Sequence, residues 1–239
     1  METEIGRLKE WIAGSGNIVF FGGAGVSTES GIPDFRSVDG LYRQSYRYPP
    51  ETILSRSFFE RCPEEFYRFY REKLTVHGAK PNAAHRRLAQ LEAEGRLRAV
   101  ITQNIDGLHQ DAGSRKVLEL HGSVRRCRCA RCGRRCPPRQ LEEAEEALPR
   151  CSCGGLLRPD IVLYEEALDE KVLEEAAEHI RAAEMLIVGG TSLAVYPAAG
   201  LLRFYRGHKL ALVNLSPTPR DGEADLLIRE RIGRVFSQV

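Results

Sequence analysis

Short apolar runs alternate with amphipathic segments along most of the chain. Six runs are short and apolar enough to be buried parallel strands: residues 18–21, 97–102, 117–120, 185–188, 210–213 and 225–228. Apolar positions at helical spacing mark helices at residues 5–12, 63–76, 81–91 and 172–183, and a further helix that ends near Tyr205. Strands that alternate with helices predict an α/β fold with a doubly wound, Rossmann-like parallel sheet.

This pattern is interrupted twice. Residues 37–62 are rich in Tyr, Pro and Arg and predict a loop with short helices. Residues 125–139 hold seven arginines, four cysteines and no acidic residue, and an acidic helix is expected at residues 141–147. The α/β pattern then resumes near Asp160. We therefore predict a Rossmann-like domain formed by residues 1–122 and 159–239, with a small zinc-binding module inserted at residues 123–158.

Bulk properties exclude several classes of protein. The 239 residues are 42% hydrophobic and 28% charged, as in globular domains. The net charge of +2 does not suggest a dedicated nucleic-acid binder. The acidic N-terminus is followed by no long apolar segment, so we expect neither a signal peptide nor a membrane span. We expect a cytoplasmic location. The arginines of residues 125–139 form either a solvated basic face or a docking surface for a partner.

A bare turn follows the first predicted strand. Gly22, Gly23, Ala24 and Gly25 have little or no side chain, as expected where a backbone turns tightly or touches a ligand. Free hydroxyls follow from Ser27 onward, as at the start of a helix. A strand, a glycine turn and a helix N-terminus predict a phosphate or dinucleotide site, because backbone N–H groups there point at the anion. A dehydrogenase would carry a third glycine where this chain has a threonine, so hydride transfer is not expected.

Polar side chains also follow the second and third predicted strands. Gln103, Asn104 and Asp106 come just after the second strand, and His121 follows the third. Open parallel sheets bind ligands at the carboxyl edge, where these turns and the glycine turn meet. Amides and carboxylates can hold ribose hydroxyls or an amide ligand, although Asn and Asp also cap helices. Histidine titrates near neutrality, so His121 is a candidate general base, although a lone histidine is often structural.

Six of the seven cysteines fall in the arginine-rich segment or shortly after it, which favours a metal site over disulfides in a reducing compartment. Two close pairs stand out: Cys129 with Cys132, and Cys151 with Cys153. Four thiolates suit a tetrahedral zinc with no open coordination position, so the ion is expected to be structural. Two spare cysteines could compete as ligands, namely Cys127 and Cys136.

The order of these motifs resembles that of the sirtuin deacylases, from about residue 8 to residue 235. The shared segments are residues 23–27, 31–36, 102–109, 121–122, the two cysteine pairs and 190–192. The resemblance implies a Rossmann-like domain and a small zinc module, with NAD and an acyl-lysine protein or peptide meeting in the cleft between them. The chain looks like a compact prokaryotic member. The implied activity is NAD-dependent protein lysine deacetylation, which gives lysine, nicotinamide and O-acetyl-ADP-ribose.

The resemblance also implies roles for individual residues, with His121 as the general base. The implied cofactor residues are Gly23, Ala24, Gly25 and Ser27 at the pyrophosphate, Asp34, Phe35 and Arg36 on the cofactor loop, Gln103 at the ribose, Asn104 and Asp106 at nicotinamide, and Thr191, Ser192 and Asn214 at the adenosine side together with Gly190. The implied substrate residues are Ile105, the peptide-binding segment with Val162, Leu163 and Tyr164, and the acyl-pocket residues Tyr67 and Tyr70.

Two departures and one pocket motif bear on specificity. Gly22 stands where many sirtuins have threonine, which should loosen a hydrogen bond near the pyrophosphate. Glu165 stands where the commoner aromatic-Gly-Glu segment has glycine, so altered peptide and acyl preferences are expected. Sirtuins that remove succinyl or malonyl groups share a Tyr-x-x-Arg pair, whereas here Tyr67 is followed by Tyr70 at the arginine position. This predicts a preference for uncharged acyl groups such as acetyl, because a buried acyl carboxylate would lack a charge partner.

Three alternatives to deacetylation are kept. The first is protein ADP-ribosyl transfer with the same cofactor, and the second is removal of longer acyl groups. The third is a non-enzymatic zinc-ribbon protein that binds nucleic acid through residues 125–139. Release of O-acetyl-ADP-ribose would distinguish deacetylation from protein ADP-ribosyl transfer. Salt-dependent binding of DNA would indicate the zinc-ribbon alternative.

Overall fold

The computed structural model of the chain describes residues 2–35, 40–41, 44, 46–75, 78–142 and 148–239. The strands are β1 (Ile18–Gly22), β2 (Leu97–Thr102), β3 (Val117–Glu119), β4 (Gly122–Cys129), β5 (Arg135–Cys136), β6 (Leu157–Ile161), β7 (Met185–Gly189), β8 (Leu210–Val213) and β9 (Leu226–Ile228). The α-helices are α1 (Glu2–Ala13), α2 (Pro50–Ile53), α3 (Arg56–Arg61), α4 (Pro63–Phe69), α5 (Ala83–Ala93), α6 (Leu108–Asp111), α7 (Arg139–Glu142), α8 (Glu170–Ala182) and α9 (Ile232–Phe236). Four 3-10 turns, η1 (Ala24–Val26), η2 (Thr28–Ser30), η5 (Ala198–Phe204) and η6 (Asp221–Glu223), and a π-helical turn, η4 (Tyr70–Leu74), complete the described elements.

The six strands predicted from the sequence form one parallel sheet with the order β3-β2-β1-β7-β8-β9. This is the strand order of a Rossmann-like sheet, so the predicted fold class is confirmed. The order reverses between β1 and β7, where Gly22 lies opposite Gly189 on one side and Thr102 of β2 on the other. The turns that leave β1, β2 and β7 therefore meet at the point where such sheets bind ligands.

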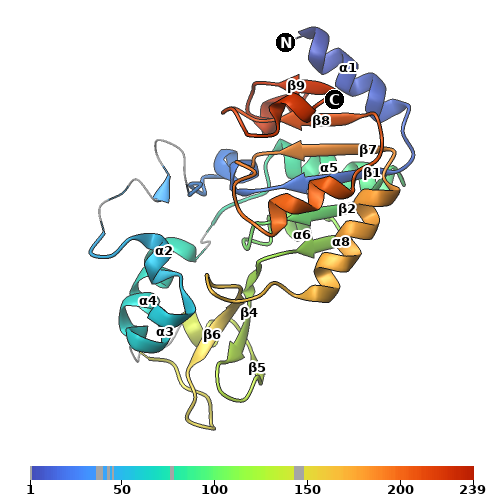
Figure 1. Cartoon of the computed structure of the whole chain (residues 1–239). Coiled ribbons are helices and arrows are strands. Elements are labelled where there is room, and N and C mark those ends of the chain that lie inside the picture. Colours follow the sequence, from blue (N-terminus) through green and yellow to red (C-terminus); the bar gives the residue numbers. More distant parts are fainter. Residues whose placement is uncertain (1, 36–39, 42–43, 45, 76–77, 143–147) are drawn as a thin grey trace.

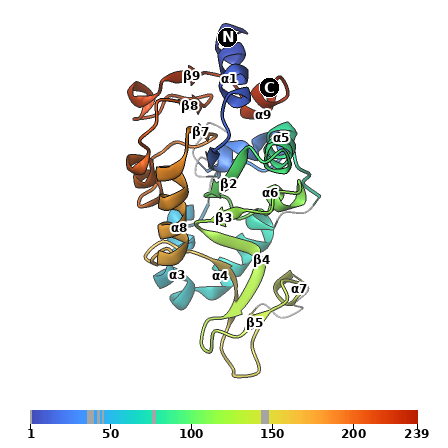
Figure 2. The same ribbon diagram turned by 90° about the vertical axis from the view of Figure 1, so that its right-hand side faces the viewer.

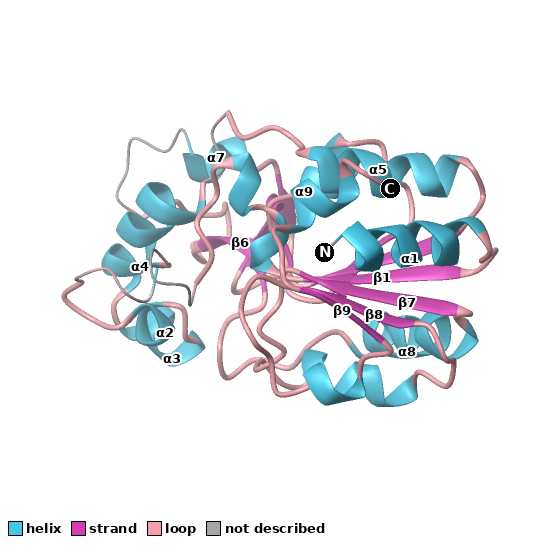
Figure 3. Ribbon diagram, turned by 90° about the horizontal axis from the view of Figure 1, so that it is seen from above, coloured by secondary structure: helices cyan, strands magenta, loops and turns pink. Residues whose placement is uncertain are grey.

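Helices cover both faces of this sheet (Figures 2 and 3). Alternate residues of β1 enter different cores: Ile18 and Phe20 pack with α1, α5 and α9, while Val19 and Phe21 pack with α8 and η5. All four are fully buried, and burial of such a side chain contributes about 1.5–3 kcal/mol. A strand that is apolar on both faces is what the continuous run at residues 18–21 predicts.

A second lobe lies beyond the carboxyl edge of the sheet (Figure 1). It contains the antiparallel sheet β5-β4-β6 and a third apolar core, which is separate from the two cores of the large sheet. Phe58, Phe66 and Tyr67 from the helical segment 50–74 pack there with Val124 and Leu157 of the β4–β6 region. The helices of residues 50–74 therefore pack with the cysteine-rich segment, and the domain limits at residues 122/123 and 158/159 stay a prediction.

Local structure differs from expectation at several helices. The predicted helix at 63–76 is α4 followed by the π-helical turn η4, and the helix expected to open at Pro81 begins at Ala83, after a capping box built by Asn82 and His85. The helix expected before Tyr205 is a 3-10 segment. Residues 143–147 of the predicted acidic helix lie outside the described residues. In the described part of the chain, no helix is long and apolar enough to cross a membrane.

Candidate active site and metal centre

A cavity of about 1340 Å³ opens between the carboxyl edge of the large sheet and the second lobe. The turns after β1, β2, β3, β7 and β8 line it on one side, and the segment after β6 lines it on the other. It gathers most of the site residues that the sequence predicts: Ala24, Gly25, Ser27, Asp34, Phe35, Gln103, Asn104, Ile105, Asp106, His121, Val162, Leu163, Tyr164, Gly190, Thr191, Ser192 and Asn214. Arg36 lies outside the described residues.

The glycine turn brings the ends of β1 and β7 into backbone contact. A Cβ on Gly23 would lie 2.8 Å from Cβ of Thr191, and a Cβ on Gly25 would lie 2.8 Å from Cα of Gly190. The N–H of Gly25 donates to the Gly190 carbonyl at 2.8 Å. The bare turn is thus required by close approach of two chain segments.

The expected helix N-terminus after this turn is replaced by the short 3-10 turns η1 and η2. The N–H groups of Gly23, Gly25, Val26 and Ser27 all donate to carbonyls of the turn or of β7. Among the described residues, the N–H groups of Ala24 and Thr28 have no acceptor, and both residues line the cavity. An anion at this turn would therefore meet these two N–H groups, which belong to short 3-10 turns and not to a helix N-terminus.

Three predicted cofactor residues form one buried hydrogen-bond network. The Ser27 hydroxyl donates to Oδ2 of Asp106 at 2.7 Å and accepts from Nδ2 of Asn104 at 3.0 Å. The other carboxylate oxygen of Asp106 accepts the N–H of Leu108 at 2.9 Å. Burial raises the pKa of Asp106, and its hydrogen bonds and Arg125 counter part of that rise. The network fixes the Asn104 amide at the cavity wall, where it can meet an amide or hydroxyl ligand.

A second set of polar contacts joins the turns after β7 and β8. Asn214 accepts the N–H of Thr191 at 3.0 Å and donates to the Thr191 carbonyl at 2.6 Å. The Thr191 hydroxyl lies 3.4 Å from Oε1 of Gln103, whose Nε2 is buried without a partner among the described residues. A buried amide with an unused donor at a cavity wall is a candidate contact for a polar ligand.

His121 is held in one tautomer by the turn after β2. Its Nδ1 lies 3.0 Å from the carbonyl oxygen of Gln103. A carbonyl can only accept, so Nδ1 carries the proton and Nε2 keeps a lone pair. Burial lowers the pKa of His121, and the hydrogen bond to Gln103 offsets part of this. The imidazole is therefore neutral at pH 7 and can accept a proton at Nε2.

The two tyrosines predicted for the acyl pocket belong to an apolar core. Tyr67 and Tyr70 are fully buried in the core of the second lobe, and neither lines the described part of the cavity. The Tyr67 hydroxyl donates to the Leu157 carbonyl, which directs it to β6. Their rings fall on the apolar face of α4 and η4, and their role in the acyl pocket stays a prediction.

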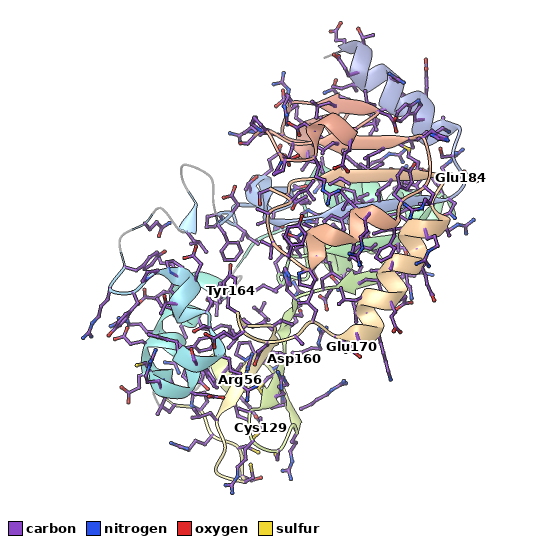
Figure 4. All side chains as sticks on the ribbon, in the orientation of Figure 1. Arg56, Cys129, Asp160, Tyr164, Glu170 and Glu184 are labelled. Carbon is purple, nitrogen blue, oxygen red and sulfur yellow. A yellow bond between two sulfur atoms is a disulfide. The ribbon has the colours of Figure 1, made fainter. Side chains whose placement is uncertain are left out.

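Only some backbone groups of the predicted peptide-binding segment are available to form hydrogen bonds with a ligand. The N–H of Tyr164 donates to the Leu54 carbonyl at 2.9 Å, and its carbonyl accepts from Arg56 at 3.0 Å. The N–H of Val162 is also used, by the His121 carbonyl at 3.0 Å. Tyr164, 38% exposed, stands between the two lobes (Figure 4). Two other exposed apolar side chains that line the cavity, Tyr196 and Leu215, had no motif to mark them.

The Phe20 ring occupies the space that a side chain at residue 22 would need. A Cβ at this position would lie 2.6 Å from Cε1 of Phe20 and 3.2 Å from Cγ2 of Val26. The Phe20 ring packs edge-on against Phe236 and is fully buried. The absence of a side chain at residue 22 is therefore a packing requirement of this core, because a threonine there would overlap the Phe20 ring.

The four predicted zinc ligands converge in the second lobe. The Sγ atoms of Cys129, Cys132, Cys151 and Cys153 lie within 4.8 Å of one another. The sulfurs of Cys129 and Cys153 are 3.5 Å apart, and those of Cys132 and Cys151 are 3.9 Å apart. Zn–S bonds of about 2.3 Å in a tetrahedron place sulfurs about 3.8 Å apart, so the tetrad fits a zinc ion.

The two spare cysteines do not join this tetrad. Cys127 and Cys136 form a disulfide between the paired strands β4 and β5, with their Cα atoms 4.9 Å apart. The expectation that they compete as ligands does not match this structure. Their registered positions on adjacent strands bring them together, which spacing along the chain did not indicate.

Comparison with known proteins agrees with this geometry. The sequence model of the Sir2 family matches residues 23–197. The chain belongs to the Sir2 family. It is 53% identical over 239 residues to an NAD-dependent protein deacetylase of Clostridium acetobutylicum, with 99% of this chain and 98% of the relative covered. It is 54% identical over 235 residues to one of Cutibacterium acnes, with 98% and 96% covered.

Solved Sir2 structures share the whole fold. One, in complex with a deacetylated p53 peptide and 3′-O-acetyl-ADP-ribose, superposes with a TM-score of 0.89 at 41% identity and covers 98% of this chain and 96% of its own. Another, a Sir2 complex with a p53 peptide and NAD⁺, superposes with a TM-score of 0.87 at 42% identity and covers 98% and 95%. This Sir2 family member thus has the same two-lobed arrangement around its cavity.

Proposed function

We propose that the protein is an NAD-dependent protein lysine deacetylase that consumes NAD as a co-substrate. The observation that carries the proposal is the neutral His121, with Nε2 unprotonated, in the same cavity as the Ser27–Asn104–Asp106 network. Family membership and the relatives named NAD-dependent protein deacetylase support the same reaction. Solved Sir2 structures in complex with acetylated peptide, NAD⁺ and O-acetyl-ADP-ribose agree with it as well.

In this proposal each part of the cavity has one task. Ala24, Gly25 and Ser27 lie at the pyrophosphate, Asn104 and Asp106 hold the nicotinamide end, and Gln103 meets the ribose. The acetyl oxygen attacks C1′ of the ribose as nicotinamide leaves. His121 then accepts a proton from a ribose hydroxyl, which attacks the acetyl carbon. A water molecule then adds to the acetyl carbon and the bond from this carbon to the lysine nitrogen breaks. The products are lysine, nicotinamide and O-acetyl-ADP-ribose.

The remaining cofactor and substrate residues act around this centre. Asp34 and Phe35 cover the cofactor, with Phe35 beside the reacting ribose, and the cofactor role expected of Arg36 falls outside the described residues. Gly190, Thr191, Ser192 and Asn214 contact the adenosine side. Ile105 and the segment with Val162, Leu163 and Tyr164 receive the peptide. The thiolate tetrad holds a structural zinc that keeps the second lobe folded. The reduced cysteines that zinc needs favour a cytoplasmic location, whereas the Cys127–Cys136 disulfide is of a kind that is rare there.

The test is direct. Purified protein is offered an acetyl-lysine peptide with and without NAD, and the products are followed by mass spectrometry. Deacetylated peptide, nicotinamide and O-acetyl-ADP-ribose in equal amounts are expected only with NAD. Transfer of labelled ADP-ribose to protein without loss of the acetyl group would instead favour ADP-ribosyl transfer.

The acyl group can be tested with the same peptide. We expect a higher kcat/KM for acetyl-lysine than for succinyl-lysine, because no arginine takes the place of Tyr70 in the Tyr-x-x-Arg motif. Equal or better use of the succinyl peptide would contradict this preference. Longer uncharged acyl groups in the same series would test whether the enzyme is a broader deacylase.

A further inference from the structure

Glu165 combines an unusual backbone with an unusual set of contacts. Its φ is +73°, in the left-handed region that favours glycine. Among the described residues that are not glycine, Leu193 alone shares a positive φ. Glu165 itself lines the cavity, and Leu193 directly follows the lining residues 190–192. Residue 165 is also the position where the resemblance to sirtuins leads us to expect glycine.

The Glu165 carboxylate is bound by one residue of another element. Oε2 accepts the N–H of Ser57 at 2.9 Å, and Oε1 accepts the Ser57 hydroxyl at 2.9 Å. Ser57 lies in the first turn of α3, where backbone N–H groups favour a negative charge. The two bonds therefore hold the side chain, and with it the strained backbone of residue 165, against α3.

Neighbouring contacts hold the same segment on both sides of Glu165. Tyr164 and Ser55 form a parallel β-bridge, so residues 164–165 run beside residues 55–57 (Figure 4 labels Tyr164 and Arg56). On the other side, Glu166 pairs with the buried Arg158 and accepts the N–H of Leu163 at 2.9 Å. The segment that receives the peptide is thus tied to both α3 and β6.

These contacts decide which main-chain groups remain for a ligand. The polar backbone groups of Tyr164 and the N–H of Val162 are occupied. In the described part of the chain, the Val162 carbonyl and both main-chain groups of Glu165 have no backbone or side-chain partner. An extended peptide that adds at this edge would need these groups in fixed positions.

We infer that Glu165 is a positioning residue for the peptide substrate, which it serves by locking its own left-handed backbone to Ser57. The inference deepens the proposed function and rests on it. Where a glycine would adopt φ +73° without strain, this chain has a residue that needs an anchor, and Ser57 supplies it. The carboxylate acts on the docking segment and not on the substrate itself.

The test uses four variants of the full chain. Glu165→Ala keeps the strain but loses the anchor, so the peptide KM is expected to rise roughly tenfold. The kcat at saturation and the KM for NAD should stay within about twofold. Glu165→Gly removes the strain, and Glu165→Gln keeps an acceptor for the Ser57 N–H, so both should return the peptide KM to within about threefold of wild type. Ser57→Ala loses one of the two bonds and should fall between these groups.

Glu60→Gln is the matched control, since Glu60 lies on α3, is exposed and pairs with Arg56. A Glu165→Gly variant as impaired as Glu165→Ala would overturn the inference, because the side chain would then act on the substrate. A Glu165→Gln variant as impaired as Glu165→Ala would overturn it as well, because charge would be the essential property. An unchanged KM in Glu165→Ala would also reject it.

A measurement of peptide binding tests this inference independently of the proposed function. The Kd of a fluorescent acetyl-lysine peptide, measured by anisotropy, should follow the same order among the variants. If wild-type protein forms no O-acetyl-ADP-ribose, the proposed function fails, while the order of Kd values still decides the role of Glu165. Thermal unfolding of each variant shows whether Ser57→Ala or Glu165→Ala has lost its fold, and the Gln and Gly variants then carry the comparison.

Discussion

At the scale of single residues, access to the cavity and hydrogen bonding identify the candidate catalytic histidine more clearly than the neighbouring sequence does. His121, His85 and His109 all have a pKa lowered by burial. Only His121 of these three lines the cavity, and its Nδ1 is held by a backbone carbonyl. His109, which lies in a motif shared with the family, is instead enclosed with His85 behind the glycine turn. A shifted pKa becomes a catalytic argument only where substrate can reach the group.

His121→Ala should lower kcat by roughly 100- to 10,000-fold, the usual contribution of a positioned acid or base. Binding of NAD and peptide should persist, because neither depends mainly on this imidazole. Since the base must be neutral and burial lowers its pKa, kcat/KM should fall with decreasing pH only below about pH 6.5. Steady-state kinetics across pH check both points. The exposed His208→Ala is the control, and near-normal turnover of His121→Ala would show that another group is the base.

At the scale of elements, α5 and α6 meet through a pair of neutral imidazoles. The rings of His85 and His109 are 4.7 Å apart, and the His109 ring also packs against Phe20 at 6.1 Å. Nδ1 of His85 accepts the N–H of Asn82, which completes the capping box of α5. The nitrogens of His109 have no partner in the described part of the chain. Neither ring can gain a proton without losing this packing.

The pair predicts acid-sensitive stability. Burial lowers the pKa of His85 to about 4 and that of His109 to about 3, so the folded state stays neutral while the unfolded chain takes up protons below pH 6.5. The free energy of unfolding is therefore retained above pH 6.5 and falls between pH 6.5 and 4, by roughly 3 kcal/mol for His85. Urea unfolding at several pH values measures this loss.

His109→Phe isolates one member of the pair, because it keeps the ring contacts and removes a protonation site. The variant should lose less stability than wild type between pH 6.5 and 4. The exposed His208→Ala should keep the wild-type slope. Identical slopes for His109→Phe and wild type would mean that other groups cause the acid sensitivity.

At the scale of the whole molecule, the cavity depends on two lobes with separate cores. The large sheet buries its own side chains on both faces, whereas the second lobe combines helices from residues 50–74 with the β4–β6 sheet. Cys127, Cys129 and Leu157 belong to that smaller core. The cysteine tetrad joins the two ends of the inserted segment, so a bound metal would stabilise the lobe and hence one wall of the cavity.

Zinc removal should therefore abolish activity without unfolding the large sheet. One zinc per chain is expected by metal analysis, and chelation should expose amides near Phe58 and Phe66 to hydrogen exchange while those of β1 stay protected. Active protein that contains no metal would contradict this role. Cys129→Ser should lose the zinc, whereas the double variant Cys127→Ser, Cys136→Ser should retain it, because those two cysteines bond to each other.

Local patterns were sufficient for much of this protein. The six sheet strands were predicted because runs buried on both faces are apolar throughout and contain few polar residues. The turns that line the cavity could be predicted because strand ends of a parallel sheet share one edge. The four cysteines that converge in the second lobe could be predicted because thiolate pairs at short spacing have few other uses in a reducing compartment.

Only the tertiary structure decided which distant segments touch. The pairing of Cys127 with Cys136 depends on the register of β4 and β5, and the burial of Tyr67 and Tyr70 depends on how α4 packs against β6. The partner of Glu165 is 108 residues away in sequence, on α3. Sequence patterns report which face of an element is apolar, but they do not report what that face meets. Motifs therefore determined the fold and many of the residues that line the cavity, and long-range packing determined how its walls are held.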